Sequence, residues 1–478
     1  MAAHHFINNR RSAPHGGQTI SVIDPSDGIA YAEIARGGMH DIDIAVQAAR
    51  SAFDHTWGRM TAAERGRLLQ RLSRALDERQ GEFALIEARD CGKPMKQARA
   101  DAAAVVRYFE FYAGACDKLH GETIPYQSGT TVLTLREPLG VTGHIIPWNY
   151  PLQIFGRSVG GSLAAGNTCV VKPSEDACLS LLRVADLAAE VGFPPGAINI
   201  VTGYGHEAGA ALVAHRGIDH ISFTGSPSVG KLVVHAAAEN HVPVTLELGG
   251  KSPQIVFADA DTDQAIPAIV NAIVQNAGQT CSAGSRVLIQ RDAYDRIMAA
   301  LADRFDTLRV GPAMHDLDCG PLIRKSQQQR VWDFLSDAHD DGIRVMAQGT
   351  IVPEAPEAGF YQAPTLLHNV PPGHRLAQEE VFGPVLVAMP FGDEADAIRL
   401  ANGTQFGLAA GIWTQSGARQ MRMAHTVRSG QVFINNYGAG GGIELPFGGV
   451  KASGHGREKG FEALYGFTTL KTIVIQHG

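Results

Sequence analysis

The chain has 478 residues, of which 45% are hydrophobic and 19% charged, and its formal net charge is −7. That length exceeds what one hydrophobic core usually serves, so two or three domains are expected. The negative charge gives no reason to expect nucleic acid or an anionic membrane as a partner. No apolar run reaches the ~18 residues of a membrane helix, and residues 1–11 lack the apolar stretch of a signal peptide.

Six cysteines occur at irregular spacing, without a Cys-x-x-Cys pair or a cluster of Cys and His that resembles a metal site. Few and scattered cysteines in a long chain are typical of a protein kept in a reducing compartment. We therefore expect free thiols, no bound metal and a cytoplasmic location.

The first third of the chain is predicted to be helical. Residues 61–64 have the capping-box pattern that begins a helix, and apolar residues then recur at helical spacing through Leu85 and Ile86. A second helix is expected from about 97 to 119. Residues 130–135 alternate between polar and apolar side chains and are predicted to form a strand.

From residue 141 the pattern changes to short apolar strands that alternate with helical stretches. The expected strands are 141–146, 168–171, 197–201, 220–223 and 244–248. This alternation is typical of a parallel, doubly wound sheet that binds a dinucleotide. A second alternating block runs from about 252 to 435, so the fold class is α/β.

The most informative residues are a carboxylate and a thiol in two short motifs. Glu247 begins the string Glu-Leu-Gly-Gly-Lys-Ser-Pro, and Cys281 ends the string Gly-Gln-Thr-Cys, 34 residues later. A cysteine attacks a carbonyl as the thiolate, but a pKa near ~8.5 leaves only a few per cent ionised at neutral pH. A carboxylate can take the thiol proton and later activate water against a thioester. Taken alone, Cys281 could instead be a buried structural cysteine, and Glu247 a salt-bridged carboxylate.

Both motifs resemble signature segments of the NAD(P)-dependent aldehyde dehydrogenase superfamily. Five further strings resemble that family's motifs, in its order and approximate spacing: Pro-Trp-Asn-Tyr-Pro at 147–151, Lys-Pro-Ser-Glu at 172–175, Phe-Thr-Gly-Ser at 223–226, Glu-Glu-Val-Phe-Gly-Pro at 379–384 and Pro-Phe-Gly-Gly at 446–449. A single glycine-rich string would be weak support, whereas seven ordered strings along one chain are specific.

The resemblance implies a division of the chain into three parts. These are an NAD-binding domain formed by 1–119 and 139–249, a catalytic domain over 250–443, and a small β element for oligomerisation formed by the hairpin 120–138 and the tail 444–478. A homodimer or homotetramer is therefore implied.

The resemblance also implies four catalytic roles. Cys281 is the nucleophile, Glu247 the general base, and Asn149 the donor that shares the oxyanion with the Cys281 backbone N–H. Glu458 resembles a carboxylate on the family's proton exit path. The alternatives are a turn residue for Asn149 and a structural ion pair for Glu458.

Lys172 and Glu175 are the implied ligands of the adenosine ribose, and solvated surface charges are the alternative. A glutamate there would accept hydrogen bonds from both ribose hydroxyls and repel a 2′-phosphate, so NAD is expected rather than NADP. Glu380 and Phe382 match positions that clasp the nicotinamide ribose and ring.

The segment 225–230 has glycines five apart at a strand-to-helix turn. This departs from Gly-x-Gly-x-x-Gly but matches the family's own version, in which a helix start lies near the pyrophosphate. The remaining residues implied to hold the cofactor are Ile146, Pro147, Trp148, Ser174, Gly205, Gly209, Phe223, Thr224, Gly225, Ser226, Val229, Gly230, Leu248, Gly249 and Gln327.

These residues predict oxidation of an aldehyde to a carboxylic acid. Cys281 would form a thiohemiacetal, hydride would pass to NAD, and water activated by Glu247 would hydrolyse the thioester. Branches of the family that pass the acyl group to coenzyme A commonly lack this glutamate, which favours hydrolysis. Acyl transfer to coenzyme A and a non-enzymatic use of the fold remain the alternatives.

The sequence does not identify the aldehyde. The glycine-rich loop 436–445 indicates open space rather than an aromatic clamp. Arg157, eight residues after Asn149, resembles the position at which succinic-semialdehyde dehydrogenases carry a carboxylate-binding arginine, which predicts an acidic semialdehyde. The alternative is that Arg157 pairs with an acidic residue of the protein itself.

Overall fold

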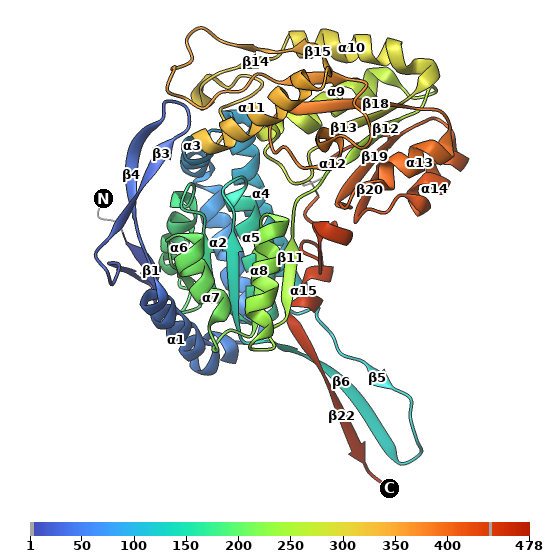
Figure 1. Ribbon diagram of the computed structural model, residues 1–478. Helices are drawn as coiled ribbons and strands as arrows, with labels where there is room; N and C mark the ends of the chain where they lie inside the picture. Colours follow the sequence, from blue (N-terminus) through green and yellow to red (C-terminus); the bar gives the residue numbers. More distant parts are fainter. Residues whose placement is uncertain (1–3, 439–441) are drawn as a thin grey trace.

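The computed structural model describes residues 4–438 and 442–478. Two sheets with helices on both faces form the body of the molecule, and a three-stranded arm projects from it (Figure 1). The fold is therefore α/β with a separate small β element, as the sequence predicts.

The first sheet has the strand order β2-β1-β9-β8-β7-β10-β11-β21. Its five central strands are parallel: β9 (Ile198–Ile200), β8 (Thr168–Pro173), β7 (Val141–Ile146), β10 (His220–Thr224) and β11 (Val244–Glu247). They agree with the expected strands to within two residues at each end. Their order is that of a doubly wound dinucleotide-binding sheet, in which the winding direction reverses between β7 and β10.

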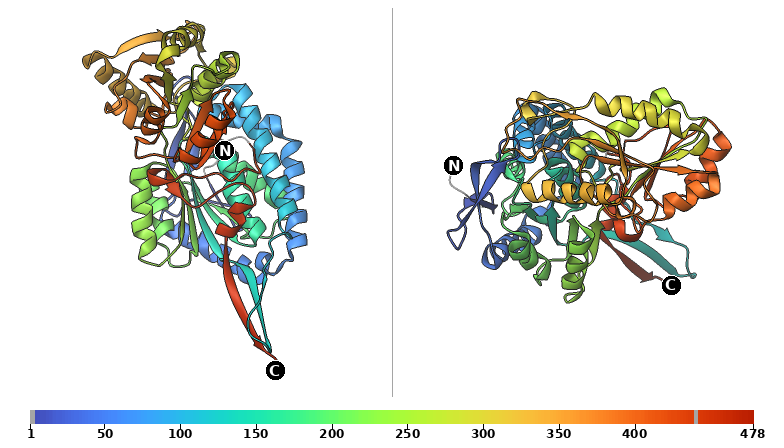
Figure 2. Two further views of the ribbon diagram at one scale, coloured as in Figure 1. Left: turned by 90° about the vertical axis from the view of Figure 1, so that its right-hand side faces the viewer. Right: turned by 45° about the horizontal axis from the view of Figure 1, so that its top comes forward.

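Helices cover both faces of this sheet (Figure 2). One face packs against α5 (Pro151–Ala165) and α6 (Leu179–Glu190), and α2 (Ala62–Asp77) and α4 (Met95–Ala115) pack on the outer side of these helices. The other packs against α1 (Met39–His55), α7 (Ala210–Ala214) and α8 (Pro227–Ala238). The parallel strands are buried on both sides, and their buried polar side chains, such as His144 and Ser222, are hydrogen-bonded to neighbouring side chains.

The N-terminal third differs from its prediction in two ways. The expected helix from residue 61 is two helices, because the chain bends at Glu78 and Arg79 between α2 and α3 (Gln80–Cys91). The capping box is confirmed: Thr61 Oγ1 accepts from the Glu64 N–H, and Glu64 Oε2 accepts from the Thr61 N–H. Four strands were also missed: β1 (His5–Ile7), β2 (Arg10–Ser12), β3 (Thr19–Asp24) and β4 (Ile29–Ala35).

The second sheet has the order β15-β17-β18-β13-β12-β19-β20, and only β15 (Arg344–Gln348) runs antiparallel to its neighbour. The parallel strands are β17 (Thr365–His368), β18 (Val385–Phe391), β13 (Arg286–Gln290), β12 (Pro253–Val256), β19 (Ala409–Trp413) and β20 (Gln431–Ile434). Helices α9 (Thr262–Val274) and α10 (Tyr294–Asp306) pack on one face, and α11 (Lys325–Asp340), α13 (Glu394–Asn402) and α14 (Gly417–Thr426) on the other.

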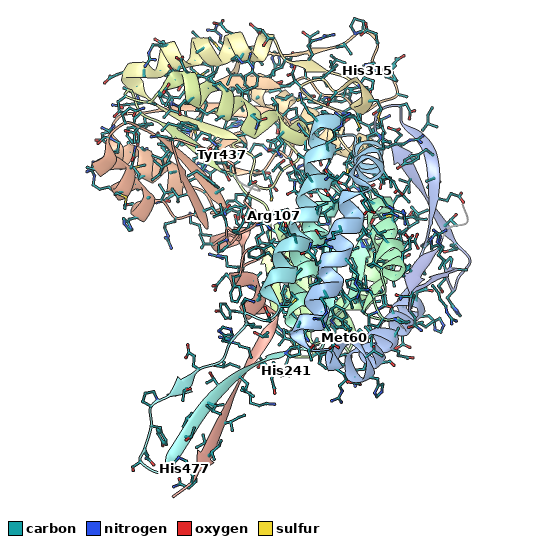
Figure 3. The ribbon with its side chains drawn as sticks, turned by 180° about the vertical axis from the view of Figure 1, so that it is seen from behind. Met60, Arg107, His241, His315, Tyr437 and His477 are labelled. Carbon is teal, nitrogen blue, oxygen red and sulfur yellow. The ribbon has the colours of Figure 1, made fainter. Side chains whose placement is uncertain are left out.

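The arm consists of β22 (Thr468–Gln476), β6 (Thr130–Pro138) and β5 (Thr123–Ile124), paired antiparallel in that order. His477 lies near its tip (Figure 3). Its apolar side chains include Val474, which is 61% exposed, and Leu470. Within the described residues no helix is both long and apolar enough to cross a membrane.

Short elements complete the fold. They are β14 (Arg309–Val310), β16 (Thr350–Ile351), α12 (Arg375–Gln378), β21 (Gly454–His455) and α15 (Glu462–Gly466). Of these, β21 pairs with β11 at the edge of the first sheet, although the sequence places it in the C-terminal tail.

Candidate active site

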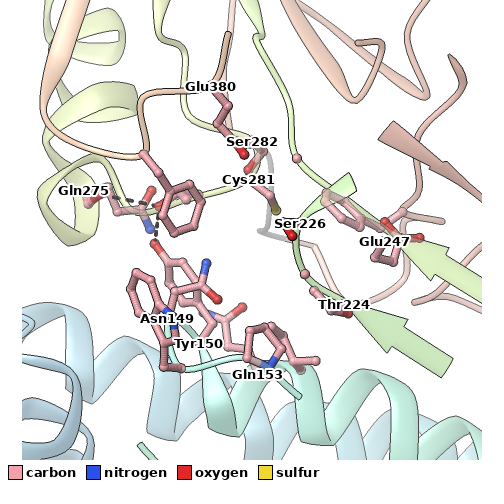
Figure 4. Close-up of a pocket in the computed structure, with 18 of the residues that line it drawn as sticks. Asn149, Tyr150, Gln153, Thr224, Ser226, Glu247, Gln275, Cys281, Ser282 and Glu380 are labelled. Carbon is pink, nitrogen blue, oxygen red and sulfur yellow. Dashed lines mark hydrogen bonds between the residues drawn. The ribbon is translucent and has the colours of Figure 1, made fainter. Parts of the chain in front are cut away.

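A cavity of about 950 Å³ lies between the two sheets (Figure 4). Asn149, Glu247 and Cys281 all line it. Asn149 lies in the loop from β7 to α5, Glu247 ends β11, and Cys281 precedes β13. The fold therefore brings the three predicted catalytic residues to one cavity from three separate segments.

Cys281 is partly exposed to the cavity and is not in a disulfide. Burial away from water raises the pKa of the Cys281 thiol to about 12, and the positive charge of Arg157 is the main opposing influence. The sulfur is therefore protonated at neutral pH and needs a proton acceptor before it can attack a carbonyl.

Glu247 is almost fully buried at the end of β11. Among the described residues neither of its carboxylate oxygens has a hydrogen-bond partner. Burial raises its pKa well above the ordinary value, while Arg157 opposes this shift and Glu458 adds to it. A Cβ atom at Gly448 would lie 2.8 Å from Glu247 Oε1, so a glycine leaves room for the carboxylate.

The Asn149 side chain is buried and oriented by the segment that leads to Cys281. Its Nδ2 donates to the Gln279 carbonyl oxygen at 3.0 Å. An amide nitrogen carries two hydrogens, so the second remains for a ligand in the cavity. The arrangement suits an oxyanion donor beside the thiol.

Arg157 and Glu458 form a buried ion pair, with Arg157 Nε 2.5 Å from Glu458 Oε2. Ser222 Oγ donates to the other Glu458 oxygen at 2.6 Å, and Arg157 Nη2 donates to Thr224 Oγ1 at 3.3 Å. Phe447 lies over the guanidinium. Arg157 lines the cavity, but its charge is already balanced by an acidic residue, which was the alternative raised from the sequence.

The predicted adenosine-ribose residues lie at the ends of neighbouring strands. Lys172, on β8, pairs with Glu175, since its Nζ lies 3.1 Å from Glu175 Oε2. Gly205 and Gly209 bound a short helical turn after β9, and Gly209 lies beside the Lys172 side chain. These are carboxyl ends of parallel strands, where such sheets bind nucleotides.

The predicted nicotinamide-end residues line the cavity itself. Glu380 Oε1 accepts from the Gly250 N–H at 2.9 Å, and burial raises the pKa of Glu380 to about 7. Phe382 has a left-handed φ of 61° and meets the Trp148 ring edge-on at 5.4 Å. Gln327 Nε2 donates to the Phe382 carbonyl at 2.8 Å, which holds this segment in place. Strained backbone of this kind is frequent at ligand sites.

Part of the predicted cofactor set lines the cavity: Pro147, Trp148, Thr224, Gly225, Ser226, Gly249, Gln327, Glu380 and Phe382. The other members are not among the described residues that line it: Ile146, Lys172, Ser174, Glu175, Gly205, Gly209, Phe223, Val229, Gly230 and Leu248. Gly230 has a packing reason of its own, because a Cβ there would lie 2.8 Å from the Leu248 side chain.

The helix that follows β10 begins at this cavity. Ser226 caps α8, and its Oγ accepts from the Val229 N–H at 3.3 Å. The N-terminus of α8 therefore lies where the reversal of the sheet opens a crevice, which is where a pyrophosphate is bound in doubly wound sheets.

Sequence reasoning missed several residues of the site. Tyr437 donates from its hydroxyl to the Ser282 carbonyl at 2.6 Å and lines the cavity, as do Phe406 and Phe447. Of these three residues, only Tyr437 belongs to the loop 436–445, and its ring contributes an aromatic surface where the sequence indicates open space; residues 439–441 lie outside the described residues. Tyr437 was the one aromatic residue within the loop 436–445, a signal that could have been used.

Across the described residues no group of three or more His, Cys, Asp or Glu side chains is arranged to hold a metal ion. The polar groups that converge on the cavity are instead a thiol, carboxylates, an amide and a guanidinium. This set suits acid–base and nucleophilic chemistry on an organic substrate.

Known proteins share this architecture. Residues 12–473 match the family model described as "Aldehyde dehydrogenase family". An aldehyde dehydrogenase of Emericella nidulans is 40% identical over 470 residues, which cover 98% of this chain and 94% of that protein. A Burkholderia cenocepacia crystal structure, assigned as an aldehyde dehydrogenase, is 71% identical over the full length of both chains, with a TM-score of 0.99. The NAD+ complex of a Bacillus cereus aldehyde dehydrogenase has a TM-score of 0.97 at 40% identity, covering 100% of this chain and 97% of that one. The chain therefore belongs to the aldehyde dehydrogenase family.

Proposed function

We propose that this protein oxidises an aldehyde to the free carboxylic acid through a covalent intermediate on Cys281, with NAD as its preferred cofactor. NAD-dependent oxidation of an aldehyde follows from the family. The observation that carries the finer proposal is the meeting of Cys281, Glu247 and Asn149 in one cavity.

In the first step the Cys281 sulfur bonds to the carbonyl carbon of the aldehyde, and the thiol proton leaves to Glu247 in its carboxylate form or to water. The carbonyl oxygen becomes an oxyanion. The free Nδ2 hydrogen of Asn149, with the Cys281 backbone N–H, stabilises that charge, and such donors are typically worth about 3 kcal/mol each.

The chemistry that NAD would supply when bound is acceptance of the hydride from the thiohemiacetal carbon. The described residues fit this cofactor: α8 begins at the reversal point of the sheet, and a Cβ at Gly249 would collide with the Glu380 carboxylate. Glu380 and Phe382 would hold the nicotinamide end, and Lys172 and Glu175 the adenosine ribose. The Glu175 charge supports NAD over NADP, because it would repel a 2′-phosphate.

In the last step Glu247 removes a proton from water while the water oxygen bonds to the thioester carbon. The carbon–sulfur bond breaks, the carboxylic acid leaves, and the sulfur regains a proton. A glutamate in this position supports hydrolysis over transfer of the acyl group to coenzyme A. Its raised pKa means that the active carboxylate form increases as the pH rises.

Two substrate classes remain open, and the site favours one of them. An acidic semialdehyde would need Arg157 to bind a carboxylate, but Glu458 already holds that guanidinium. The aromatic side chains Tyr150, Phe406, Tyr437 and Phe447 line the cavity. These contacts support an aldehyde with an uncharged chain, and an acidic semialdehyde is the alternative.

We also propose that the arm joins subunits into a homodimer or homotetramer. Its exposed apolar side chains and the unpaired edge of β22 within the described chain support this, because exposed strand edges are normally covered. The six free cysteines support a cytoplasmic location.

The test of the proposed function is Cys281→Ala, assayed by NADH absorbance with propanal and NAD. The variant should form no NADH, and Cys116→Ala, which alters a buried cysteine at the end of α4, should retain activity. The same assay with and without coenzyme A separates hydrolysis from acyl transfer. NADH formation by Cys281→Ala at the wild-type rate would refute the mechanism.

A further inference from the structure

Two buried side chains donate to one backbone oxygen of the site, the main-chain carbonyl of Asn149. Lys93 Nζ lies 2.9 Å from this oxygen and Asn276 Nδ2 lies 3.0 Å from it. A carbonyl oxygen has two lone pairs, so these donors use both of them. The direction of this carbonyl fixes the peptide plane next to the Asn149 side chain. Lys93 and Asn276 are together called the Asn149 clamp below.

Lys93 is held in one orientation by its other partners. Its ammonium also donates to Asp101 Oδ2 and, at 3.3 Å, to Glu87 Oε2, so its three hydrogens are all directed. These carboxylates are anchored in turn by Ser180 and Gln153, whose donors lie 2.6 Å away. The ammonium therefore links α3, α4, α5 and α6 to the loop that carries Asn149.

Asn276 reaches the same oxygen from the catalytic side of the cavity. It begins a turn of three successive left-handed residues, with φ values of 50° at Asn276, 53° at Ala277 and 73° at Gly278. That conformation is unfavourable for Ala277, whereas asparagine tolerates it better than most residues other than glycine. Backbone strain of this kind persists only where contacts with the surrounding structure hold the conformation in place. Here the strained turn directly precedes the Gln-Thr-Cys segment that ends at Cys281.

The Asn276 amide joins the two loops of the site. Its Nδ2 donates to the Asn149 carbonyl and also to the Gln279 carbonyl at 3.3 Å. The Gln279 carbonyl is the acceptor that orients the Asn149 side chain. Both acceptors are carbonyl oxygens, so the amide nitrogen must face them rather than the amide oxygen.

We propose that Lys93 and Asn276 are positioning residues that lock the oxyanion donor Asn149 against the segment ending at Cys281. The inference rests on the proposed function, because it assigns a role to the donor of that reaction. A preorganised donor works only at the position where charge develops. Displacing a reacting group by about 1 Å can cost on the order of 100-fold in rate, so a loosened Asn149 should slow acylation.

A purely structural role predicts something different. If the Asn149 clamp only stabilised the fold, its loss would lower the thermal midpoint but leave the rate of the chemical step in the folded enzyme unchanged. The test therefore has to measure that rate apart from stability and cofactor binding.

The first experiment compares Asn276→Gly with Ala277→Gly. Both changes place glycine in the same left-handed turn, so both relieve strain and add freedom, but only the first removes the donor to Asn149. Single-turnover NADH formation from propanal should fall about 100-fold in Asn276→Gly and stay near the wild-type rate in Ala277→Gly. The KM for NAD should be unchanged in both.

Alkylation of Cys281 by iodoacetamide is the second measurement on the same variants. This reaction creates no oxyanion, so it reports whether the thiol itself is still in place. An Asn276→Gly enzyme that alkylates normally but acylates slowly supports the clamp. If both rates fall together, the Cys281 segment has moved and the proposed role is overturned.

The other half of the clamp is tested with Lys93→Met. That change alone leaves two buried carboxylates without a counter-ion, so it is made in an Asp101→Asn background. The two changes together remove one positive and one negative charge. The double variant should acylate about 100-fold more slowly than Asp101→Asn alone. Equal rates in these two enzymes would overturn the role of Lys93.

The outcomes also separate this inference from the proposed function. If the wild-type protein forms no NADH, the proposed function itself is contradicted. If the wild type is active and Asn276→Gly matches Ala277→Gly in single-turnover rate, only the positioning role of Asn276 is wrong.

Discussion

The ion pair between Arg157 and Glu458 makes a quantitative prediction that also decides the substrate class. The two side chains are 8% and 0% exposed, and their charged atoms are 2.5 Å apart. Arg157→Met would leave the Glu458 carboxylate buried and without its counter-ion, while the Ser222 hydroxyl still donates to it. Removing one partner of a buried pair typically costs about 3–5 kcal/mol, because the other charge stays desolvated.

Two further variants serve as controls for this predicted loss of stability. Arg157→Met combined with Glu458→Gln removes both charges and should recover most of the loss, since neutral replacement of a buried pair is often harmless. Arg11→Met breaks a pair of similar length, 2.7 Å to Asp186, but Arg11 is 53% exposed. That change should cost less than about 1 kcal/mol.

The assays are urea denaturation and steady-state kinetics with an acidic semialdehyde and a neutral aldehyde of equal length. If the ion pair is internal, Arg157→Met should lose stability and lose activity on both substrates. If Arg157 binds a substrate carboxylate, KM should rise for the acidic substrate alone. The internal role is refuted if Arg157→Met is no less stable than Arg11→Met, or if the double variant recovers nothing.

Three further predictions follow from single residues. Glu247→Gln should accumulate the acyl enzyme, detectable by mass spectrometry, and lose the rise of the deacylation rate with pH that the raised pKa of Glu247 predicts for the wild type. Because burial raises the pKa of Glu247 in the folded protein, the free energy of unfolding of the wild type should fall as the pH rises from 4.5 through that pKa, and it should fall less in Glu247→Gln. An equal pH dependence of the two unfolding free energies, measured by urea denaturation, would contradict this. Glu175→Ala should narrow the preference for NAD over NADP in kcat/KM, and an unchanged ratio would remove Glu175 from cofactor selection. Thr61→Ala should cost about 1 kcal/mol in urea denaturation without changing kcat, because it removes the cap of α2.

The parts of the fold that the sequence predicts well are those with a strong local pattern. The buried parallel strands β7 and β10 are short segments rich in Val, Ile, Thr and Phe that alternate with helical stretches, so their positions could be located within two residues. The strand β1 was missed because it is three residues long and begins with histidine. The break between α2 and α3 falls at Glu78 and Arg79, and a single glycine nearby, Gly81, does not by itself predict the end of a helix.

The site shows the same division. Cys281, Glu247 and Asn149 sit in recognisable motifs, and the cavity brings them together. The partners of Arg157 and of the Asn149 carbonyl could not be anticipated, because Glu458 lies 301 residues from Arg157 and Lys93 is 56 residues from Asn149. Contacts between distant segments leave no periodic signal, so only the folded chain reveals them.

The arm has a consequence for the order of folding. Its ladder pairs Thr468 with Pro138, residues that are 330 positions apart. Closing so long a loop costs conformational entropy, and strands that bury few apolar side chains offset little of that cost. The base of the arm is anchored in the first sheet, where the Phe467 carbonyl accepts from Asn167 Nδ2 and β7 begins just after Pro138. The arm should therefore form after the sheet that supports it and be lost when that sheet unfolds. A partner that binds the complete arm therefore binds a chain whose first sheet has already folded.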